Sequence, residues 1–346
     1  MSSTLRISAL LLAVLMLLGG CQTIAGRSAE PVSGVEFAMN TWVEQRWYGD
    51  EAQETYDDIM ACLRDLEARL SLYREDSEIA ALNASAGREP VRISQDTFTL
   101  LSRAKEFSAE SGGLFDVTIA PLTLTWGITS GEPHIPGEEE IAAAQALVDY
   151  RGLILDREAK TAMLAQEGMK VDLGGIAKGM AASVCAEIPR KHGVSGYLSI
   201  GGNTMVCGKK PDGQDFLVGL RDPRGEANEA LGSFAMDGLT MATTGDYERY
   251  FEQDGVRYHH VIDPFTGRPS ASDLISVTVI SADGTLADCL STSIFLQGSG
   301  ALEQYFARND CRVIAVTKDL QVYATPGLWD DFTINPSKTQ YTFHKS

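Results

Sequence analysis

The sequence lacks three features that would each indicate a particular class of protein. Its longest mostly apolar run, Ile7–Leu18, covers twelve residues, whereas a membrane-spanning helix needs about 20. Its 29 lysines and arginines are outnumbered by 47 aspartates and glutamates, and the net charge of −18 argues against nucleic acid and anionic membrane surfaces as partners. Its cysteines form no C-x-x-C pair, so neither a zinc site nor a redox dithiol is predicted.

The chain also lacks any internal repeat, low-complexity segment or linker that would divide residues 35–335. With 44% hydrophobic residues it has ample material for a core, so we expect one domain over this range. Five widely spaced cysteines lie within the range, namely Cys62, Cys185, Cys207, Cys289 and Cys311. We expect them to be small buried side chains, with one disulfide as the alternative in an oxidising compartment.

The N-terminus has the pattern of an export signal. Arg6 precedes the apolar run, and Leu18-Gly19-Gly20-Cys21 follows it. This pattern resembles a bacterial lipobox, which makes residues 1–20 a lipoprotein signal peptide and Cys21 the lipidated first residue of the mature chain. Residues 21–34 would then be a polar tether. A plain secretory signal is the alternative, and both interpretations predict an exported protein.

The motif that organises the chain is Val-Asp-Leu-Gly-Gly-Ile-Ala-Lys-Gly-Met-Ala at residues 171–181. Alternating apolar residues over 169–173 predict a short buried strand, and Gly174-Gly175 allows a sharp turn. The alanine-rich run from Ile176 to about Ile188 predicts a helix.

The start of this helix has the chemistry of a phosphate site. A helix N-terminus presents unpaired N–H groups, and Lys178 adds a cation inside the first turn. The alternative is an ordinary strand–turn–helix corner with an exposed lysine. Asp172 favours a functional site, because a carboxylate in an apolar strand is costly unless it meets a partner, a ligand or a metal.

Apolar spacing and turn residues predict the other elements. Helices are expected over residues 51–72 after Asp50 as N-cap, from Gln95 after Ser94 as N-cap to Gly112-Gly113, and over 138–148, 286–296 and 301–308. Strands are expected within 35–48 and near 153–156, 162–165, 196–200, 215–220, 276–280, 312–317 and 321–325, with a hairpin of 247–251 and 256–262 turning at Asp254-Gly255. These elements predict the α+β class, as a single mixed domain with antiparallel hairpins and packed helices.

Two further segments carry candidate functional groups. His259 and His260 are adjacent in the predicted hairpin, so strand alternation places them on opposite faces, with one able to reach a cleft. Asp288 and Thr292 are four residues apart on a helix and share one face, as two oxygen ligands of a hard cation would. Each pair taken alone also fits a purely structural role.

Taken together, seven segments resemble the ApbE family over about residues 35–330. They are Leu-Tyr-Arg-Glu-Asp-Ser-Glu-Ile (72–79), Gly-Gly-Leu-Phe-Asp-Val-Thr (112–118), Val-Asp-Leu-Gly-Gly-Ile-Ala-Lys-Gly (171–179), Ser-Ile-Gly-Gly-Asn (199–203), Thr-Thr-Gly-Asp-Tyr (243–247), His-Val-Ile-Asp-Pro-x-Thr-Gly-Arg-Pro (260–269) and Ala-Asp-x-x-Ser-Thr (287–292). That family comprises periplasmic FAD:protein FMN transferases, some of which instead hydrolyse FAD to FMN and AMP. Departures are small: Met180 replaces a usual aromatic, and Met39-Asn40-Thr41 replaces the commoner Met-Gly-Thr.

The resemblance implies an elongated FAD cleft with Mg²⁺ near the pyrophosphate. By position in the family motifs, the Mg²⁺ ligands would be Gly175, Asp288 and Thr292, the FAD contacts Met39, Tyr73, Leu114, Phe115, Asp116, Asp172, Lys178 and Ile262, and the catalytic base His260. Tyr73 would lie beside the flavin ring.

The resemblance also implies an activity and a location. FMN would pass from FAD to a threonine or serine hydroxyl of an exported acceptor, with release of AMP. The family's acceptors are subunits of membrane-bound, flavin-dependent electron-transport complexes, and the enzyme would be lipid-anchored to a membrane of the bacterial cell envelope, facing the periplasm. A metal-dependent FAD pyrophosphatase and a non-catalytic flavin-binding lipoprotein are the alternatives.

Overall fold

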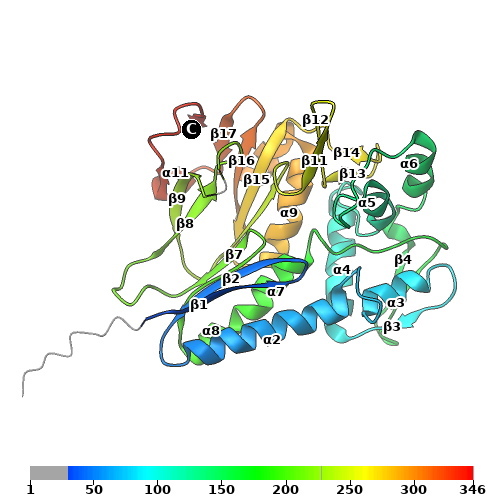
Figure 1. The fold of residues 1–346 in the computed structure, drawn as a ribbon, viewed down its shortest axis with the longest axis horizontal. Helices are drawn as coiled ribbons and strands as arrows, with labels where there is room; N and C mark the ends of the chain where they lie inside the picture. Colours follow the sequence, from blue (N-terminus) through cyan, green and yellow to red (C-terminus); the bar gives the residue numbers. More distant parts are fainter. Residues whose placement is uncertain (1–29, 227, 346) are drawn as a thin grey trace, which may run out of the picture. The chain divides into compact units, whose positions relative to one another are not determined.

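The computed structural model describes residues 30–226 and 228–345. From Pro31 onward the chain forms one compact unit (Figure 1). No helix within the described residues is both long and apolar enough to cross a bilayer. The predicted signal peptide, residues 1–20, lies outside the described residues, and so do Cys21 and most of the predicted tether.

A nine-stranded, largely antiparallel sheet forms the centre of this unit (Figure 1). In spatial order its strands are β1 (Val32–Ala38), β2 (Thr41–Tyr48), β6 (Ser195–Ile200), β7 (Asn203–Cys207), β10 (Thr240–Gly245), β15 (Leu274–Ser281), β16 (Arg312–Thr317), β17 (Gln321–Ala324) and β19 (Thr342–His344). Every residue of β15 is buried, because both faces of this central strand are covered. The β1–β2 hairpin turns on Met39 and Asn40, both with φ near +55° (56° and 55°).

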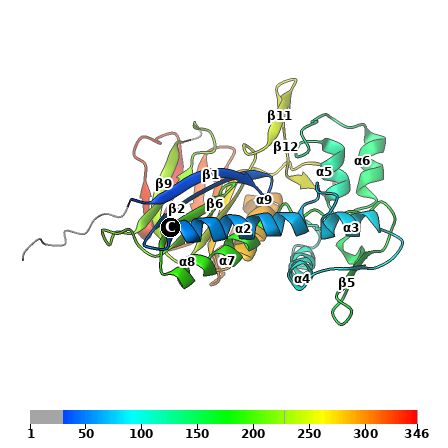
Figure 2. The ribbon, with the colours of Figure 1, turned by 60° about the horizontal axis from the view of Figure 1, so that its bottom comes forward.

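Two small sheets and two short hairpins flank the main sheet. Their strands are β3 (Val91–Arg92), β4 (Leu153–Asp156) and β5 (Thr161–Leu164); β8 (Phe216–Arg221), β9 (Ala230–Met236) and β18 (Phe332–Ile334); β11 (Tyr250–Gln253) and β12 (Val256–His259); and β13 (Ile262–Asp263) and β14 (Arg268–Pro269). The β11–β12 hairpin projects from the body of the unit (Figure 2), and it turns on Asp254 and Gly255, both with positive φ.

Ten helices and two 3-10 turns surround the sheets within the described residues. They are α2 (Ala52–Leu70), α3 (Glu78–Ala84), α4 (Gln95–Glu110), α5 (Ala120–Trp126), α6 (Glu138–Gln145), α7 (Ala177–Cys185), α8 (Glu187–His192), α9 (Gly284–Gln297), α10 (Leu302–Phe306) and α11 (Leu328–Asp331), with 3-10 turns at Tyr150–Gly152 and Ser299–Ala301. Helices α2, α7 and α9 pack on the main sheet and α7 packs on α9, whereas α5 and α6 pair beside the β13–β14 hairpin (Figure 1).

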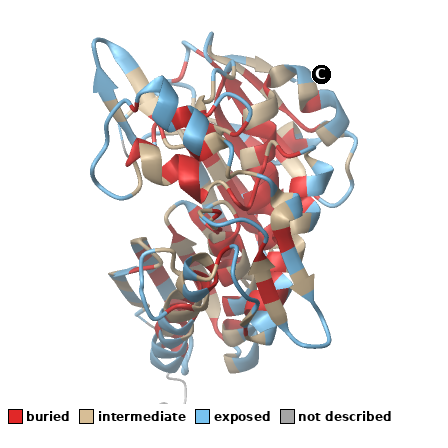
Figure 3. Ribbon diagram, turned by 90° about the vertical axis from the view of Figure 1, so that its right-hand side faces the viewer, coloured by how far each residue is buried: buried red, intermediate tan, exposed pale blue. Residues whose placement is uncertain are grey.

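Buried side chains form three clusters. The first lies between the main sheet and helices α2, α7 and α9. The second fills the space between the main sheet and the β8–β9–β18 sheet, and a small third cluster joins α5, α6 and Ile262. In Figure 3 the buried residues run along the strands and the inward sides of the helices. The fold is thus the single α+β domain that the sequence predicts.

Several local predictions are wrong, each for an identifiable reason. Residues 169–173 are no strand, because Asp172 N–H donates to the Val117 carbonyl and Asn83 bonds both backbone groups of Val171. Helix α2 follows Glu51 without a side-chain cap, so Asp50 is not its N-cap. The helix expected to reach Ile188 breaks after Cys185, since Pro189 has no N–H to donate to the Cys185 carbonyl.

The structure also adds elements that the sequence did not indicate. Helices α3 and α5 and strands β3, β7, β9, β10, β18 and β19 are all additional. The folded unit extends beyond the predicted range of 35–335, because β1 begins at Val32 and β19 pairs with β17. Strand β12 ends at His259, so the strand predicted to run to Ile262 is shorter.

Candidate active site

A cavity of about 530 Å³ lies between the β1–β2 turn, the C-terminal end of α2 and the N-terminal end of α7. Every candidate FAD, metal and base residue of the sequence analysis lines it, and these are Met39, Tyr73, Leu114, Phe115, Asp116, Asp172, Gly175, Lys178, His260, Ile262, Asp288 and Thr292. They come from six separate stretches of the chain, so the fold brings together residues that are up to 253 positions apart (Met39 to Thr292: 292 − 39). Cys21, the candidate lipidation site, lies outside the described residues.

The crossing of α7 and α9 forms the floor of this cavity. Gly179 has no side chain, and a Cβ added there would lie 2.6 Å from the Asp288 Cβ. The two helices therefore approach closely, and the Gly179 N–H donates to Asp288 Oδ2 over 2.8 Å. Asp288 is 4% exposed and lines the cavity. The hydrogen bond from Gly179 therefore holds its carboxylate in one orientation at the cavity wall.

Oxygen donors gather beside Asp288. Thr292 lies one helical turn further along α9, and its hydroxyl is 3.1 Å from the Thr244 hydroxyl. Gly175 lies opposite, with room for its backbone alone: a Cβ would meet the Phe115 ring at 2.9 Å and the Thr292 hydroxyl at 3.7 Å. A carboxylate, a hydroxyl and a backbone carbonyl are the ligands that a hard divalent cation prefers, so this group of residues fits Mg²⁺.

The start of α7 has the groups that the sequence predicts for an anion. Lys178 lies in the first turn, and its Nζ donates to the Gly174 carbonyl over 2.9 Å. The backbone N–H groups of Gly175 and Lys178 have no acceptor among the described residues. Two free amides and an ammonium at a helix N-terminus suit a phosphate.

Asp172 finds partners within the protein. Its Oδ1 accepts from the Gly174 N–H over 2.8 Å, and its Oδ2 accepts from the Thr123 hydroxyl over 3.1 Å. These bonds offset the cost of placing a carboxylate in this partly buried position, and the carboxylate still lines the cavity.

His260 lies at the cavity wall and His259 behind it. The Arg249 carbonyl is 3.0 Å from His260 N and 3.2 Å from His260 Nδ1. A carbonyl only accepts, so Nδ1 carries the proton and Nε2 keeps its lone pair. Burial, with help from the neighbouring charges of Lys178 and Arg249, lowers the pKa of His260 to about 3, so the ring is neutral at pH 7.

His259 is a core residue. Its ring packs edge-on against Phe295, its Nε2 is 3.1 Å from the Ser270 carbonyl, and burial lowers its pKa. Only one of the two histidines lines the cavity, as the sequence predicts, although the strand invoked for the prediction ends at His259 itself.

Two of the predicted FAD contacts, Tyr73 and Asp116, differ in exposure and in hydrogen-bond partners. Tyr73 is 45% exposed at the cavity mouth, and its hydroxyl donates to Thr129 Oγ1 over 2.9 Å. Asp116 is 7% exposed, and its carboxylate accepts from Thr118 N–H, Thr118 hydroxyl and Tyr150 N–H. The Asp116 side chain therefore holds its own loop, and burial raises the pKa of this carboxyl.

The charges of the lining do not favour an anion on their own. Five carboxylates line the cavity, from Glu67, Asp116, Asp172, Glu248 and Asp288, against the two cations of Lys178 and Arg249. A diphosphate would therefore need an additional positive charge, which a divalent metal held by Asp288 and Thr292 would supply.

Sequence reasoning missed several lining residues. Thr244 lies within the Thr-Thr-Gly-Asp-Tyr segment of 243–247, and Arg249 follows this segment by two residues; the sequence motif assigns neither a role. Arg249 contacts His260 through its backbone carbonyl, and any residue type has such a carbonyl, so the sequence could not indicate this contact. Trp42 and Thr129 reach the cavity only through the hairpin and the loop that carry them.

Comparison with known proteins agrees with this geometry. The ApbE family model matches residues 39–316. A FAD:protein FMN transferase of Treponema pallidum is 32% identical over 91% of this chain and 92% of its own, and one of Klebsiella pneumoniae is 35% identical over 76% and 82%. The crystal structure of the ApbE protein of Thermotoga maritima superposes with a TM-score of 0.81 at 29% identity, covering 87% of this chain and 99% of that one.

An α+β fold whose cavity is lined by oxygen donors, one lysine and one neutral histidine fits a protein that binds a phosphate-bearing ligand. Within that class, the chain belongs to the ApbE family.

Proposed function

We propose that this protein transfers FMN from FAD to a threonine or serine hydroxyl of an exported acceptor protein and releases AMP. The observation that carries the proposal is the convergence of all twelve candidate residues on one cavity. The names of the relatives support it, since both relatives described above are FAD:protein FMN transferases.

In this reaction the acceptor hydroxyl attacks the phosphorus of the FMN half, and the bond from that phosphorus to the bridging oxygen breaks. His260 Nε2 takes the hydroxyl proton, because Nδ1 is engaged with the Arg249 carbonyl. The bridging oxygen leaves with AMP.

The phosphates would be held at the start of α7 by Lys178 and the free amides of Gly175 and Lys178. Mg²⁺ would be held by the Asp288 carboxylate, the Thr292 hydroxyl and the Gly175 carbonyl, and when bound it neutralises charge on the diphosphate. Met39, Leu114, Phe115 and Ile262 would surround the rest of FAD, with Tyr73 against the flavin ring.

We further propose that the protein is lipid-anchored through Cys21 to a membrane of the bacterial cell envelope and faces the periplasm. Its acceptors would be exported subunits of membrane flavin-dependent electron-transport complexes. The lipobox pattern and the family resemblance support this location.

The test of the activity mixes the protein from residue 30 onward with FAD, Mg²⁺ and a candidate acceptor, and then weighs the acceptor. A gain in mass equal to one FMN supports the transferase. AMP release without modified acceptor would instead identify an FAD pyrophosphatase, and FAD binding without AMP release would identify a non-catalytic flavin-binding protein.

Replacing Asp288 by asparagine tests the metal. The shape is nearly kept while one anionic ligand is lost, so flavin transfer should fall steeply and recover in part at excess Mg²⁺. Normal turnover of Asp288→Asn in the presence of a chelator would show that no catalytic metal binds here.

A further inference from the structure

One six-residue segment, 244–249, contacts both the candidate metal ligand Thr292 and the candidate base His260. At one end the Thr244 hydroxyl is 3.1 Å from the candidate metal ligand Thr292. At the other end the Arg249 carbonyl is 3.2 Å from His260 Nδ1, and the Arg249 guanidinium donates to the carbonyl of Asn40 in the β1–β2 turn. The segment therefore contacts both the candidate base and a candidate metal ligand.

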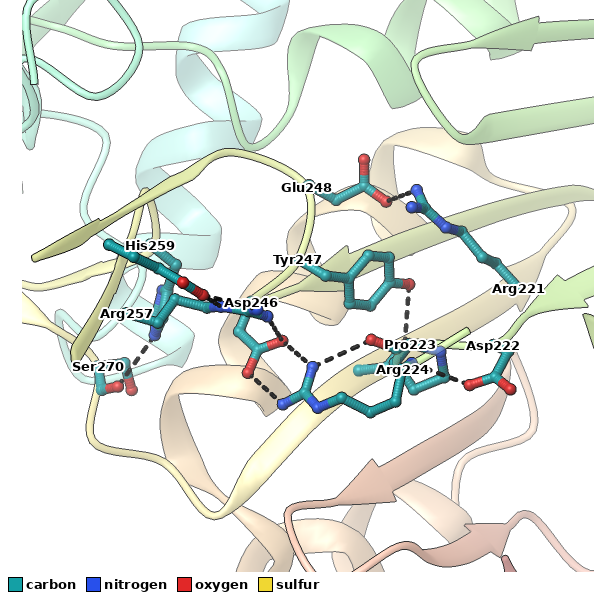
Figure 4. A network of polar contacts seen from close by, with 12 residues as sticks. Arg221, Asp222, Pro223, Arg224, Asp246, Tyr247, Glu248, Arg257, His259 and Ser270 are labelled. Atoms are coloured by element: carbon teal, nitrogen blue, oxygen red, sulfur yellow. Dashed lines mark hydrogen bonds and ion pairs between the residues drawn. The ribbon is translucent and has the colours of Figure 1, made fainter. Parts of the chain in front are cut away.

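Three arginines contact the middle of this segment (Figure 4), of which Arg257, 3.9 Å from Asp246, is the more distant partner of that carboxylate. Arg224 donates two hydrogen bonds of 2.7 Å to the Asp246 carboxylate, which is 7% exposed. Arg221 lies over the Tyr247 ring at 4.8 Å and 3.4 Å from Glu248. Each side chain from 246 to 248 thus contacts an arginine. Arg221 is the last residue of β8 in the small β8–β9–β18 sheet, and Arg224 lies in the loop from β8 to β9.

The Arg224–Asp246 pair has the geometry of a strong interaction. A bidentate guanidinium–carboxylate pair fixes orientation as well as distance. Loss of Arg224 leaves the nearly buried Asp246 carboxylate with only the more distant Arg257, at 3.9 Å, to offset its charge. Neither Arg224 nor Asp246 lines the cavity, so neither contacts the substrate. Their effect on the reaction passes through Arg249, three residues after Asp246.

We propose that Arg224 and Asp246 are positioning residues for the base. Their ion pair holds the Arg249 carbonyl where it accepts from His260 Nδ1–H, and this keeps the lone pair of Nε2 directed at the cavity. The inference rests on the proposed function in taking His260 as the base.

The first test is kinetic. Asp246→Asn and Arg224→Lys should each lower kcat for FMN transfer by roughly ten- to a hundred-fold, the range seen when an outer partner of a site residue is removed. The KM for FAD should change by less than about three-fold, since FAD does not contact the pair. Asp246→Glu keeps the charge and should recover part of the rate.

Two comparisons separate positioning from general damage. Arg308 and Asp310 form a second bidentate pair, at 2.8 and 2.6 Å, outside the cavity, so Asp310→Asn should transfer FMN at the wild-type rate. The double variant Arg224→Gln with Asp246→Asn should lose no more than the worse of its two single variants, because the pair acts as one unit. Arg224→Lys keeps a positive charge beside Asp246, so it remains informative if Asp246→Asn does not fold.

The second test needs no activity. In protein with ¹⁵N-labelled histidine, the long-range ¹⁵N–¹H spectrum should show His260 as the Nδ1–H tautomer, and Asp246→Asn or Arg224→Lys should give mixed tautomers. The exposed His134 should give the same signals in all variants.

The outcomes distinguish this inference from the proposed function. If the wild type transfers no FMN, the proposed function fails, and the tautomer of His260 alone decides the positioning role. If the wild type transfers FMN while folded Asp246→Asn and Arg224→Lys match its kcat and its His260 tautomer, the positioning role is wrong.

Discussion

At the residue scale, two neighbouring histidines with different surroundings carry the sharpest expectations. His260 lines the cavity with Nε2 free, whereas His259 is packed against Phe295 and the Ser270 carbonyl. One position in the chain thus separates a candidate base from a core side chain.

The two histidines should behave differently when truncated. His260→Ala should still bind FAD but lose FMN transfer by roughly two to four orders of magnitude, because a base acts mainly in the transition state. His259→Ala should chiefly lower the melting temperature, since it opens a void beside Phe295. Transfer assays and thermal melts on both variants decide this, and an inactive His259→Ala beside an active His260→Ala would reverse the assignment.

The depressed histidine pKa values also predict how stability depends on pH. Burial lowers the pKa of His260 to about 3, whereas an unfolded histidine titrates near 6.5. Between those values the unfolded chain binds a proton that the folded chain does not. The free energy of unfolding therefore falls as pH falls from about 6.5 toward 3, by up to ~1.4 kcal/mol per pH unit for this residue.

Urea unfolding at pH 7 and pH 5 measures this effect. His260→Gln should lose less stability than the wild type between the two values, while His134→Gln, which changes an exposed ring, should match the wild type. Equal pH dependence in all three proteins would contradict the assigned direction.

At the element scale, the cavity depends on how closely α7 approaches α9. Gly179 faces the Gly284 carbonyl and the Asp288 Cβ across this contact. The same glycine donates its N–H to the Asp288 carboxylate over 2.8 Å. Gly179 therefore both allows the close contact of the two helices and orients the candidate metal ligand Asp288.

Gly179→Ala should therefore separate the helices. We expect a loss of about 1–3 kcal/mol in the free energy of unfolding from overpacking, together with weaker Mg²⁺ binding because Asp288 moves. Thermal melts and Mg²⁺ titration measure the two effects. Gly300→Ala is the control, since a Cβ there has no neighbour within 4 Å, and an equal effect of both substitutions would argue against the close contact.

The elements that the sequence predicted are those with local signals. Helix α4 follows its cap Ser94, and the β11–β12 hairpin turns on Asp254-Gly255. Strands β9 and β18 pair across about 100 residues, and such pairing leaves no nearby pattern to read. Residues 169–173 looked like a strand because apolar alternation also occurs where a side chain such as Asn83 satisfies the backbone.

The same division applies to the site. Asp288, Thr292 and Lys178 were identified because their side chains carry the chemistry and lie in distinctive motifs. The contact of the Arg249 carbonyl could not be identified, because every residue has a backbone carbonyl. The Arg224–Asp246 pair could not be identified either, because no local pattern connects two residues that are 22 positions apart.

At the scale of the whole molecule, the anchor and the enzyme unit should be separable. Cys21 precedes the folded unit, which begins at Pro31. Cys21→Ser should therefore abolish lipid attachment while the melting temperature and FMN transfer of the protein stay unchanged. Detergent partitioning of the expressed protein measures attachment, and a Cys21→Ser protein that still carries lipid would contradict the lipobox.

The segment after β18 has a consequence for the order in which the molecule assembles. Lys338 forms ion pairs with Asp222 at 2.9 Å and Glu229 at 2.6 Å, and the Tyr341 hydroxyl donates to Asp222. Asp222 lies two residues before Arg224, so the loop that holds the active-site segment is itself held by residues synthesised more than 110 positions later (338 − 224 = 114). If Arg224 and Asp246 position the base as proposed, a chain emerging from the ribosome would form the β1–β2 hairpin and α2 early but complete its catalytic geometry only after residue 341 has emerged. We therefore expect a nascent chain to lack FMN transfer until this C-terminal segment has emerged.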